Sequence, residues 1–533
     1  MIVGLGGAGG IAAHVLTHAG IEVVALEAGP NLDATKAAFD EIGNDRRQRL
    51  SSPKARLEIP TWRPSASEAA KPSPWSTLGV NAVGGSTLHY AGLNPRFLPW
   101  NFESRRRTIE RYGDGAVPAG STLADWPLTY AELEPFYDAV EYAIGVAGSA
   151  GNVRGCVGPT GNPFEGPRER NYPMRPLRRS GWTELTAGAA RRLDWHPFPA
   201  PAALNSEPFN GNPECTYCGF CDSNCCHRNA KGATSATVIP RALETGLLTI
   251  ESSARVVAIE VDGDGLARGV TYVKSGEERF QPARIVLLAG FTYENSRLLL
   301  ASRSTAWPDG LSNNHGQVGQ HYMVHIIPRV LGLFPGRALN IFSGPWSQAT
   351  CLDDWNADNF DHTGLGFVGG GMLAASHEMK PIGTAGGPLP ATVPRWGSEW
   401  KGWLKRNAQS IGSASAQLDS LSYETNRLDL DPVATDAYGV PRVRITYETR
   451  DHERRGAAFL RGKLETWLLE AGASETWSGE DFIVEARHAY GGTRMGDSPE
   501  TSVADKQGFS HEIPTSAFWV RRCFPQLGAT IQP

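Results

Sequence analysis

Three glycines near the start of the chain have the spacing of a phosphate-binding turn. Gly4, Gly6 and Gly9 follow a short apolar run and open a segment whose apolar residues recur at helical spacing. The free backbone N–H groups at such a helix start bind a pyrophosphate, because they lie at the positive end of the helix dipole. Glu27 closes the next apolar run and is expected to accept the two hydroxyls of an adenosine ribose. This spacing predicts a dinucleotide-binding βαβ unit.

A second glycine turn lies at Gly84, Gly85 and Ser86. A turn of this kind, at the start of a short helix, offers several backbone N–H groups and one hydroxyl to a single anion. Farther along, an apolar run ends at Ala289 and Gly290 before another helical stretch, which predicts a second strand-to-helix junction facing the same nucleotide. Two phosphate-binding turns favour one long cofactor. They disfavour the alternative of an NAD-dependent dehydrogenase, which only the first βαβ unit supports.

Five of the eight cysteines are crowded together, at Cys215, Cys218, Cys221, Cys225 and Cys226. The first four have the spacing of a bacterial ferredoxin, but Cys226 stands where that motif has proline. An iron–sulfur cluster here would let electrons leave one at a time. The alternatives are a zinc site completed by His227, a disulfide pair, or a structural loop of thiols. We favour the structural loop and expect no resident metal.

These residues are far apart in the chain, so regular elements must bring them together. Residues 1–3 and 21–26 have the pattern of two strands, with a helix between them. The pattern over 248–273 predicts short alternating strands. Thr129 is expected to cap one core helix, and a second core helix is expected over 457–470.

The composition of the 533 residues describes a soluble globular protein of two or three domains, with 41% hydrophobic and 20% charged residues. The net charge of −5 gives no electrostatic reason to expect nucleic acid or an anionic membrane as a partner. No run approaches the roughly 18 apolar residues of a transmembrane segment. The first strand looks clipped, so we expect a cytoplasmic protein as the sequence stands, or a periplasmic one if a leader has been lost.

With both glycine turns and the late segment 487–496 (RHAYGGTRMG), the chain resembles the glucose-methanol-choline (GMC) flavoprotein oxidoreductases over nearly its whole length. Segments 197–201, 215–221 and 229–231 resemble the branch that contains the flavoprotein subunits of gluconate and related sugar-acid dehydrogenases. The resemblance implies FAD as cofactor. It also implies an α/β fold, in which a discontinuous Rossmann-like FAD-binding domain carries a substrate domain built on an antiparallel sheet plus helices.

The resemblance assigns roles to the residues above. It implies that Glu27 binds the adenosine ribose and that the backbone of Val257 meets the adenine. The glycines of the first turn then lie at the pyrophosphate, and Gly84, Gly85 and Ser86 lie beside the phosphates and the flavin. The branch places its last cysteine one position later than the ferredoxin motif, which favours Cys226 over Cys225 as the counterpart.

The resemblance further implies oxidation of an alcohol by hydride transfer to the flavin, with a polyol, sugar or sugar acid as substrate and a protein or quinone as electron acceptor. His488 matches the histidine before the family's glycine pair. An imidazole titrates near neutral pH, so it suits the base that takes the hydroxyl proton. A structural histidine packed in a loop is the alternative.

We expect residues 1–325 to form the FAD-binding region, with an irregular insertion near 106–232. Residues 326–480 then form the substrate domain, and residues 481–533 return to the FAD domain. The last part of the chain, from 515 onward, lacks the turn glycine and the second active-site residue of the family, and Arg521 and Arg522 stand where a small residue is expected. This segment looks truncated, so the alternative function is a catalytically impaired FAD-binding remnant.

Overall fold

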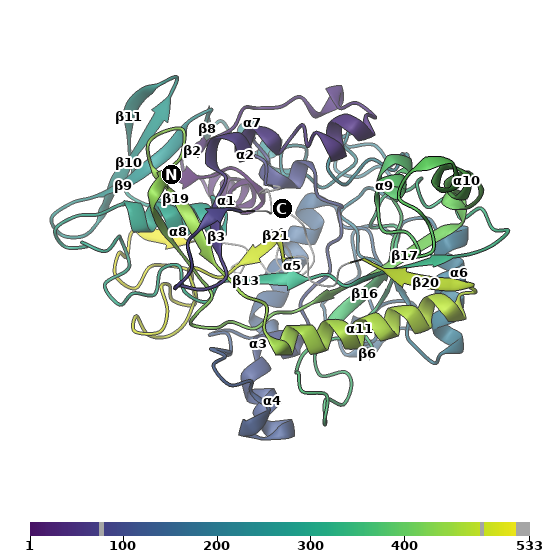
Figure 1. Ribbon diagram of the computed structural model, residues 1–533. Helices are drawn as coiled ribbons and strands as arrows, with labels where there is room; N and C mark the ends of the chain where they lie inside the picture. The colour runs from purple at the N-terminus through teal and green to yellow at the C-terminus, as the bar shows by residue number, and fades with distance from the viewer. Residues whose placement is uncertain (74–78, 480–483, 519–533) are drawn as a thin grey trace.

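The computed structural model describes residues 1–73, 79–479 and 484–518 (Figure 1). Its first sheet has five parallel strands in the order β22-β12-β1-β2-β8. Their bounds are β1 Ile2–Val3, β2 Val23–Glu27, β8 Leu248–Ser252, β12 Val286–Leu288 and β22 Ser516–Phe518. The strands come from the beginning, the middle and the end of the described chain, so this layer is discontinuous in sequence.

Helices and a small sheet complete this first layer. α1 (Gly7–His18) connects β1 to β2 and packs against α7 (Val238–Glu244), and α8 (Thr292–Ala301) follows β12. The small sheet is antiparallel and consists of β9 (Arg255–Val261), β10 (Ala267–Lys274) and β11 (Glu277–Pro282). Val256 and Val270 of the small sheet share a buried apolar cluster with Leu26 and Leu288 of the parallel sheet, so the two sheets form one body.

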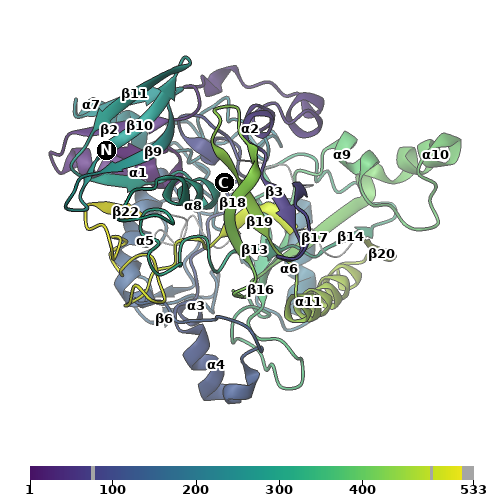
Figure 2. The same ribbon diagram turned by 60° about the vertical axis from the view of Figure 1, so that its left-hand side comes forward.

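A second, larger sheet lies on the other side of the molecule (Figure 2). It has eight strands, all paired antiparallel. They are β7 Phe198–Pro199, β13 Met323–Ile326, β14 Arg329–Leu333, β15 Thr350–Leu352, β16 Gly371–Ala375, β17 Ile411–Leu418, β20 Glu475–Ser478 and β21 Val484–Tyr490. Strands β7 and β21 come from outside the 326–480 range, which remains a proposal for the substrate domain.

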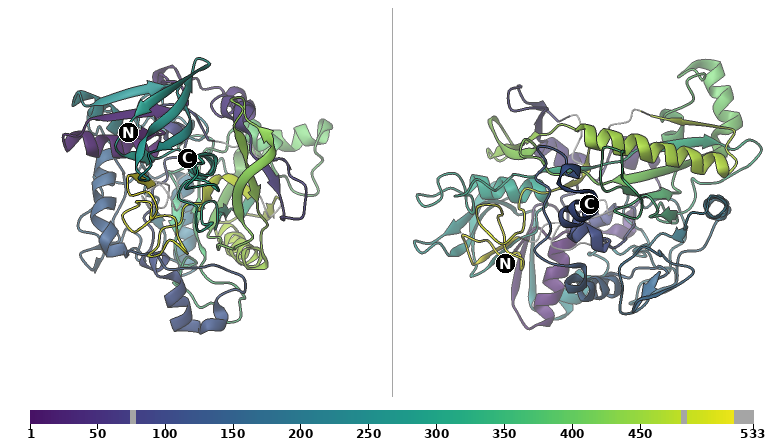
Figure 3. Two further views of the ribbon diagram at one scale, coloured as in Figure 1. Left: turned by 90° about the vertical axis from the view of Figure 1, so that its left-hand side faces the viewer. Right: turned by 90° about the horizontal axis from the view of Figure 1, so that it is seen from below.

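The two faces of the large sheet pack against different partners. The helices α11 (Asp451–Glu470) and α6 (Gly181–Arg192) contact one face (Figure 3). On that face the side chains of Trp182 and Trp467 are fully buried. The opposite face carries Phe198 and Cys351, which pack against Leu93 in the segment that follows the second glycine turn. The large sheet therefore faces the nucleotide-binding layer across that turn.

A third sheet joins early and late parts of the chain. It has the order β18-β19-β3-β4, with β18 Arg427–Thr435, β19 Pro441–Thr446, β3 Thr61–Arg63 and β4 Lys71–Pro72. The other helices are α2 Ser52–Glu58, α3 Pro99–Phe102, α4 Ser104–Tyr112, α5 Tyr130–Ile144, α9 Pro381–Gly386 and α10 Gly397–Asn407, and a short hairpin pairs β5 Asn152–Val153 with β6 Cys156–Val157. Short helical turns span Ala34–Lys36, Ile42–Arg46, Gly85–Leu88, Asp114–Ala116 and Ala408–Ser410.

Local sequence signals explain several of these elements. Thr129 caps α5 reciprocally, because its hydroxyl accepts from the N–H of Glu132 at 3.3 Å while its own N–H donates to the Glu132 carboxylate at 2.7 Å. The helix α2 was not predicted from the sequence. In the part of the chain that the structure describes, we find no helix with the length and apolarity that crossing a bilayer requires.

Candidate active site

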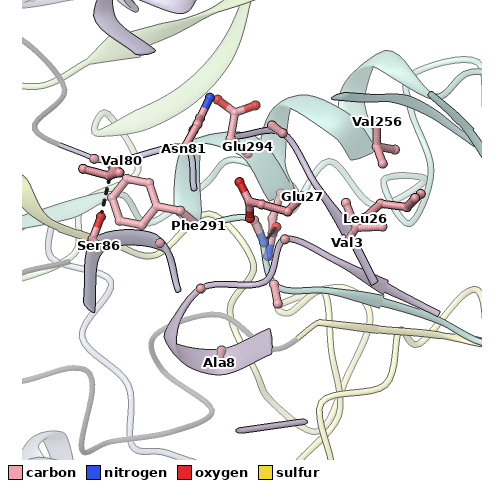
Figure 4. A pocket seen from close by; sticks show the side chains of 18 of the residues that line it. Val3, Ala8, Leu26, Glu27, Val80, Asn81, Ser86, Val256, Phe291 and Glu294 are labelled. Carbon is pink, nitrogen blue, oxygen red and sulfur yellow. Dashed lines mark hydrogen bonds between the residues drawn. The ribbon is translucent and has the colours of Figure 1, made fainter. Parts of the chain in front are cut away.

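The two glycine turns meet at one cavity of about 170 Å³ (Figure 4). The start of α1 supplies Gly6, and the short helix Gly85–Leu88 supplies Gly85 and Ser86. The turns are bonded to each other, since the N–H of Gly84 donates to the carbonyl of Leu5 at 2.8 Å. A Cβ added to Gly85 would lie 2.8 Å from the Cα of Gly6. A glycine at position 85 is therefore needed for the backbones to approach this closely.

Glu27, at the end of β2, forms one wall of this cavity and is buried (Figure 4). One carboxylate oxygen accepts from the N–H of Leu5 at 2.9 Å, and the other accepts from the N–H of Gly29 at 2.9 Å. Burial raises the pKa of Glu27 to about 7, and the two backbone donors oppose that rise. Each oxygen keeps an acceptor site for a further hydroxyl.

Two of the expected glycines, Gly9 and Gly84, allow the backbone around the cavity to pack and turn as it does. A Cβ on Gly9 would lie 2.0 Å from the carbonyl oxygen of Gly4, so Gly9 is required for the packing of α1 against β1. Gly84 has a φ of +95° and turns the chain into the second loop. Gly4, Ala289 and Gly290 line the cavity as expected from the sequence. Val256 of β9 lines the cavity, and the backbone contact of Val257 with the adenine remains a proposal.

A buried ionic network that we did not predict from local patterns lies beside this cavity. Arg255 pairs with Glu58, with Glu294 at 3.1 Å and with Asp436 at 3.4 Å. Glu294 also accepts from Arg297 at 2.9 Å. Burial alone would raise the pKa of Glu294, but the charges of Arg255, Lys54 and Arg297 hold it below its ordinary value. Members of this network come from α2, β9, α8 and the turn after β18, so only the folded chain assembles it.

His488 lies on β21, at the edge of the large sheet nearest to α8. Its side chain is 1% exposed. Its Nδ1 lies 3.1 Å from Nδ1 of His325 on the paired strand β13. The hydroxyl of Thr292, at the start of α8, makes a weak contact of 3.5 Å with the carbonyl of Ala489. The neighbour of His488 along the strand thus contacts the helix that walls the cofactor cavity.

A second cavity of about 120 Å³ borders the histidine pair. His325 and Tyr490 line it, together with Asp419 after β17. The ring of Tyr490 lies 5.1 Å from the ring of His325. Aromatic side chains of Trp100 and Trp126 stand beside hydroxyl, amide and carboxylate groups in this lining, including Asn101, Ser420 and Ser422. The cavity therefore offers both apolar faces and hydrogen-bond partners to a small molecule.

The cysteine segment lies behind the second glycine turn. Burial raises the pKa of Cys215 to about 12 and also raises those of Cys218, Cys221 and Cys225, and the charge of Cys226 acts on all four in the same direction. The five thiols are free, and among the described residues no group of three or more His, Cys, Asp or Glu side chains is arranged to hold a metal ion. Nζ of the buried Lys231 donates to the carbonyls of Tyr90, Cys221 and Asn224 at 3.1, 2.9 and 2.9 Å.

Comparison with known proteins was made for the whole sequence. No family model matches the chain. The gluconate 2-dehydrogenase flavoprotein of Pantoea cypripedii is 32% identical over 553 residues, covering 99% of this chain and 89% of the relative. The chain belongs to the GMC flavoprotein oxidoreductases. As a member of that family it is an FAD-dependent oxidoreductase that acts on CH–OH groups.

Further relatives are similar over nearly the whole chain, and a solved structure shares its fold. The 2-methyl-1,2-propanediol dehydrogenase of Mycolicibacterium austroafricanum is 27% identical, covering 96% of this chain and 88% of the relative. The fructose dehydrogenase large subunit of Gluconobacter japonicus is 26% identical, covering 96% and 90%. The structure of pyridoxine 4-oxidase from Mesorbium loti superposes with a TM-score of 0.55 at 16% identity, over 97% of this chain and 92% of that one. This likeness confirms the expected fold class.

The residues around the first cavity fit the adenosine and pyrophosphate end of FAD. The two glycine turns pack so closely that a Cβ on Gly4 or Gly85 would clash with backbone, and the N–H groups of the turns suit a pyrophosphate. The carboxylate oxygens of Glu27 keep acceptor sites that suit the hydroxyls of a ribose. The segment 519–533, including Arg521 and Arg522, lies outside the described residues. The expectations about a missing second active-site residue concern that segment.

Proposed function

We propose that this GMC oxidoreductase oxidises a CH–OH group of a polyol, sugar or sugar acid, with His488 as the base. The observation that carries the proposal is the junction of the two cavities. The strand that holds His488 contacts the helix that walls the glycine-lined cavity, and His488 itself pairs with a residue that lines the second cavity. A base, a cofactor site and a substrate chamber are thereby adjacent.

FAD is bound in this proposal by the residues of the first cavity. Gly4, Gly6 and Gly85 offer backbone to the pyrophosphate, Ser86 offers its hydroxyl, and Glu27 accepts from the ribose. Bound FAD supplies the acceptor for the hydride that leaves the alcohol carbon. Phe291 and Val256 contribute apolar walls to this cavity.

His488 takes the proton of the substrate hydroxyl. The O–H bond breaks and an N–H bond forms at the imidazole, while the carbon-bound hydrogen leaves with its electron pair and a carbonyl remains. The ring is buried, and its neutral form is the one that can accept a proton. Positioned general bases of this kind contribute roughly 10²–10⁴-fold to rate.

The second cavity supports a hydroxylated substrate. Aromatic faces such as Trp100 and Trp126 suit the C–H surfaces of a polyol or sugar ring, and the adjacent polar groups suit its hydroxyls. The relatives agree with this class, since their names specify gluconate, fructose and a diol. Electrons then pass to a protein or quinone acceptor. The cysteine segment takes part in that step only if it binds iron, which metal and sulfide analysis of the purified protein tests.

The test is anaerobic reduction of the FAD-loaded protein. We expect the yellow flavin absorbance to bleach on addition of at least one of gluconate, fructose or 2-methyl-1,2-propanediol, each tried separately. Protein that stays colourless after reconstitution with FAD contradicts the cofactor site. Protein that binds flavin and is reduced by dithionite, but by no polyol, sugar or sugar acid, supports the catalytically impaired remnant, which the similarity over nearly the whole chain does not favour.

A further inference from the structure

We propose that His325 and Asp419 are positioning residues that hold His488 in the tautomer with an unprotonated Nε2. The inference rests on the proposed role of His488 as base. It adds the two groups that determine which nitrogen of the His488 ring accepts the proton. Neither group was singled out by the sequence. Both come from strands or turns far from residue 488 in the chain.

The geometry joins the three side chains in a row. His325 on β13 and His488 on β21 adjoin the paired residues Val324 and Ala489, at the point where the register of the two strands shifts. Their Nδ1 atoms are 3.1 Å apart and the rings are nearly perpendicular, at 84°. Nε2 of His325 lies 3.7 Å from Oδ1 of Asp419. The two histidines are almost completely buried, whereas the Asp419 side chain is 28% exposed and lines the second cavity.

A hydrogen bond between two Nδ1 atoms has only two neutral arrangements. Either His325 donates and His488 accepts, or His488 donates and His325 accepts. In the first arrangement His488 carries its proton on Nε2 and cannot act as a base there. In the second arrangement Nε2 of His488 is unprotonated and its lone pair can accept a proton.

Asp419 selects the second arrangement. Its carboxylate faces Nε2 of His325, so it favours a proton on that nitrogen. His325 then has a lone pair on Nδ1 and accepts from Nδ1–H of His488. The same carboxylate stabilises the positive charge that appears on the pair when the substrate proton arrives at Nε2 of His488. Orienting partners of this kind also fix the tautomer of metal-binding histidines, where their loss typically costs 10–100-fold.

The row also gives the proton a route outward. After Nε2 of His488 gains the hydroxyl proton, Nδ1 of His488 can release its own proton to Nδ1 of His325. His325 can in turn release a proton from Nε2 to Asp419, which lies at the cavity surface. Other titratable groups around the pair are Tyr490, beside the ring of His325, and Asp125 and Arg494, which line the same cavity.

The experiment compares three variants as FAD-loaded proteins by stopped-flow flavin reduction over a range of pH. His325→Ala removes the acceptor, and we expect the limiting rate to fall 10–100-fold with flavin content unchanged. His325→Asn keeps an oxygen near the Nδ1 position, and we expect it to recover most of that loss. Asp419→Asn removes the charge, so the acid limb of the pH profile should move to lower pH. Loss of a nearby carboxylate lowers the pKa of an imidazolium.

Control variants separate this inference from the proposed function. His196→Ala and Asp354→Asn each break a His–Asp pair on the surface, with Nδ1 and Oδ1 2.7 Å apart and the His196 side chain 55% exposed, and should leave the pH profile unchanged. If His488→Ala reduces its flavin at the wild-type rate, the proposed base is wrong. If His488→Ala is slow while the His325 and Asp419 variants match the controls, only the positioning role is wrong.

A measurement that needs no turnover completes the test. In FAD-loaded protein labelled with heavy nitrogen in its histidines, NMR should show His488 protonated on Nδ1 and unprotonated on Nε2. The opposite tautomer overturns the inference. If His325→Ala does not retain flavin, Asp419→Asn and this spectrum still decide the question, because both leave the buried pair in place.

Discussion

Gly6 and Gly85 are separated by 79 positions in the chain, yet a Cβ on Gly85 would lie 2.8 Å from the Cα of Gly6. The two phosphate-binding turns therefore share one backbone contact. A side chain at position 85 would displace the first turn, whereas a Cβ on Gly6 would lie at an ordinary 3.7 Å from the Cα of Gly85. The contact makes the cofactor cavity a property of both turns together.

Gly85→Ala should therefore lose FAD. The new Cβ meets backbone, and φ at this position is +51°, which an alanine adopts only with strain. We expect the ratio of flavin to protein absorbance after reconstitution to fall several-fold. Gly462→Ala is the matched control: this glycine lies inside α11 with open space around its Cβ position, so the change should keep full flavin and stabilise the protein by up to about 1 kcal/mol. Equal flavin content in both variants would contradict the shared contact.

Glu27 should make the stability of the FAD-free protein fall as the pH rises. Its pKa rises from an ordinary value of 4.5 to about 7 in the folded protein, so between these values the folded state binds the proton more tightly than the unfolded state. The stabilisation is complete below pH 4.5 and is lost as the pH passes through 7, by about 3 kcal/mol in total. Glu27→Gln removes this dependence. Glu165 and Asp353 also have raised pKa values, so only the difference between wild type and variant in denaturant unfolding at each pH isolates Glu27.

His488→Ala should retain FAD and lose catalysis. The side chain does not line the glycine cavity, so we expect normal flavin content. The limiting rate of flavin reduction by the best substrate should fall roughly 10²–10⁴-fold, since the hydroxyl proton loses its acceptor. Stopped-flow absorbance measures this rate directly. A fall of less than tenfold would assign His488 to the structural alternative.

Glu141 should be among the most sensitive residues outside the site. It is fully buried on α5, where its carboxylate accepts two bonds of 2.9 Å from Arg96 and a further one from Arg168. Glu141→Gln removes the carboxylate that two buried guanidinium groups share and leaves them only Glu134 and Glu165 as acidic partners, which we expect to cost about 3–5 kcal/mol. Glu110→Gln breaks an exposed pair with Arg106 and should cost less than about 1 kcal/mol. Denaturant midpoints of the two variants, both saturated with FAD, should differ clearly. Coincident midpoints would contradict the prediction.

Sequence reasoning reached the parts of the fold that depend on local chemistry. The reciprocal cap at Thr129 and Glu132 needs only residues three apart, and α5 begins where the cap predicts. The first glycine turn and Glu27 belong to one short βαβ unit whose spacing is fixed by strand and helix geometry. Such features are readable before any long-range contact is known.

The rest depends on pairings that no local pattern encodes. The contact of His325 with His488 exists because β13 pairs with β21, across 163 positions of sequence. The network around Arg255 draws charges from four separate segments. Strand alternation is readable from the sequence of β9, but packing decides which of its side chains line the cavity, and Val256 is one of them.

Lys231 links the unfolding of the cysteine segment to that of the segment after the second glycine turn. Its ammonium is 1% exposed and holds carbonyls from both segments. A buried cation released from one of these partners finds no water to replace it, so the partners separate only when the whole region opens. The two segments should therefore behave as one cooperative unit, losing their protection from hydrogen exchange at the same denaturant concentration.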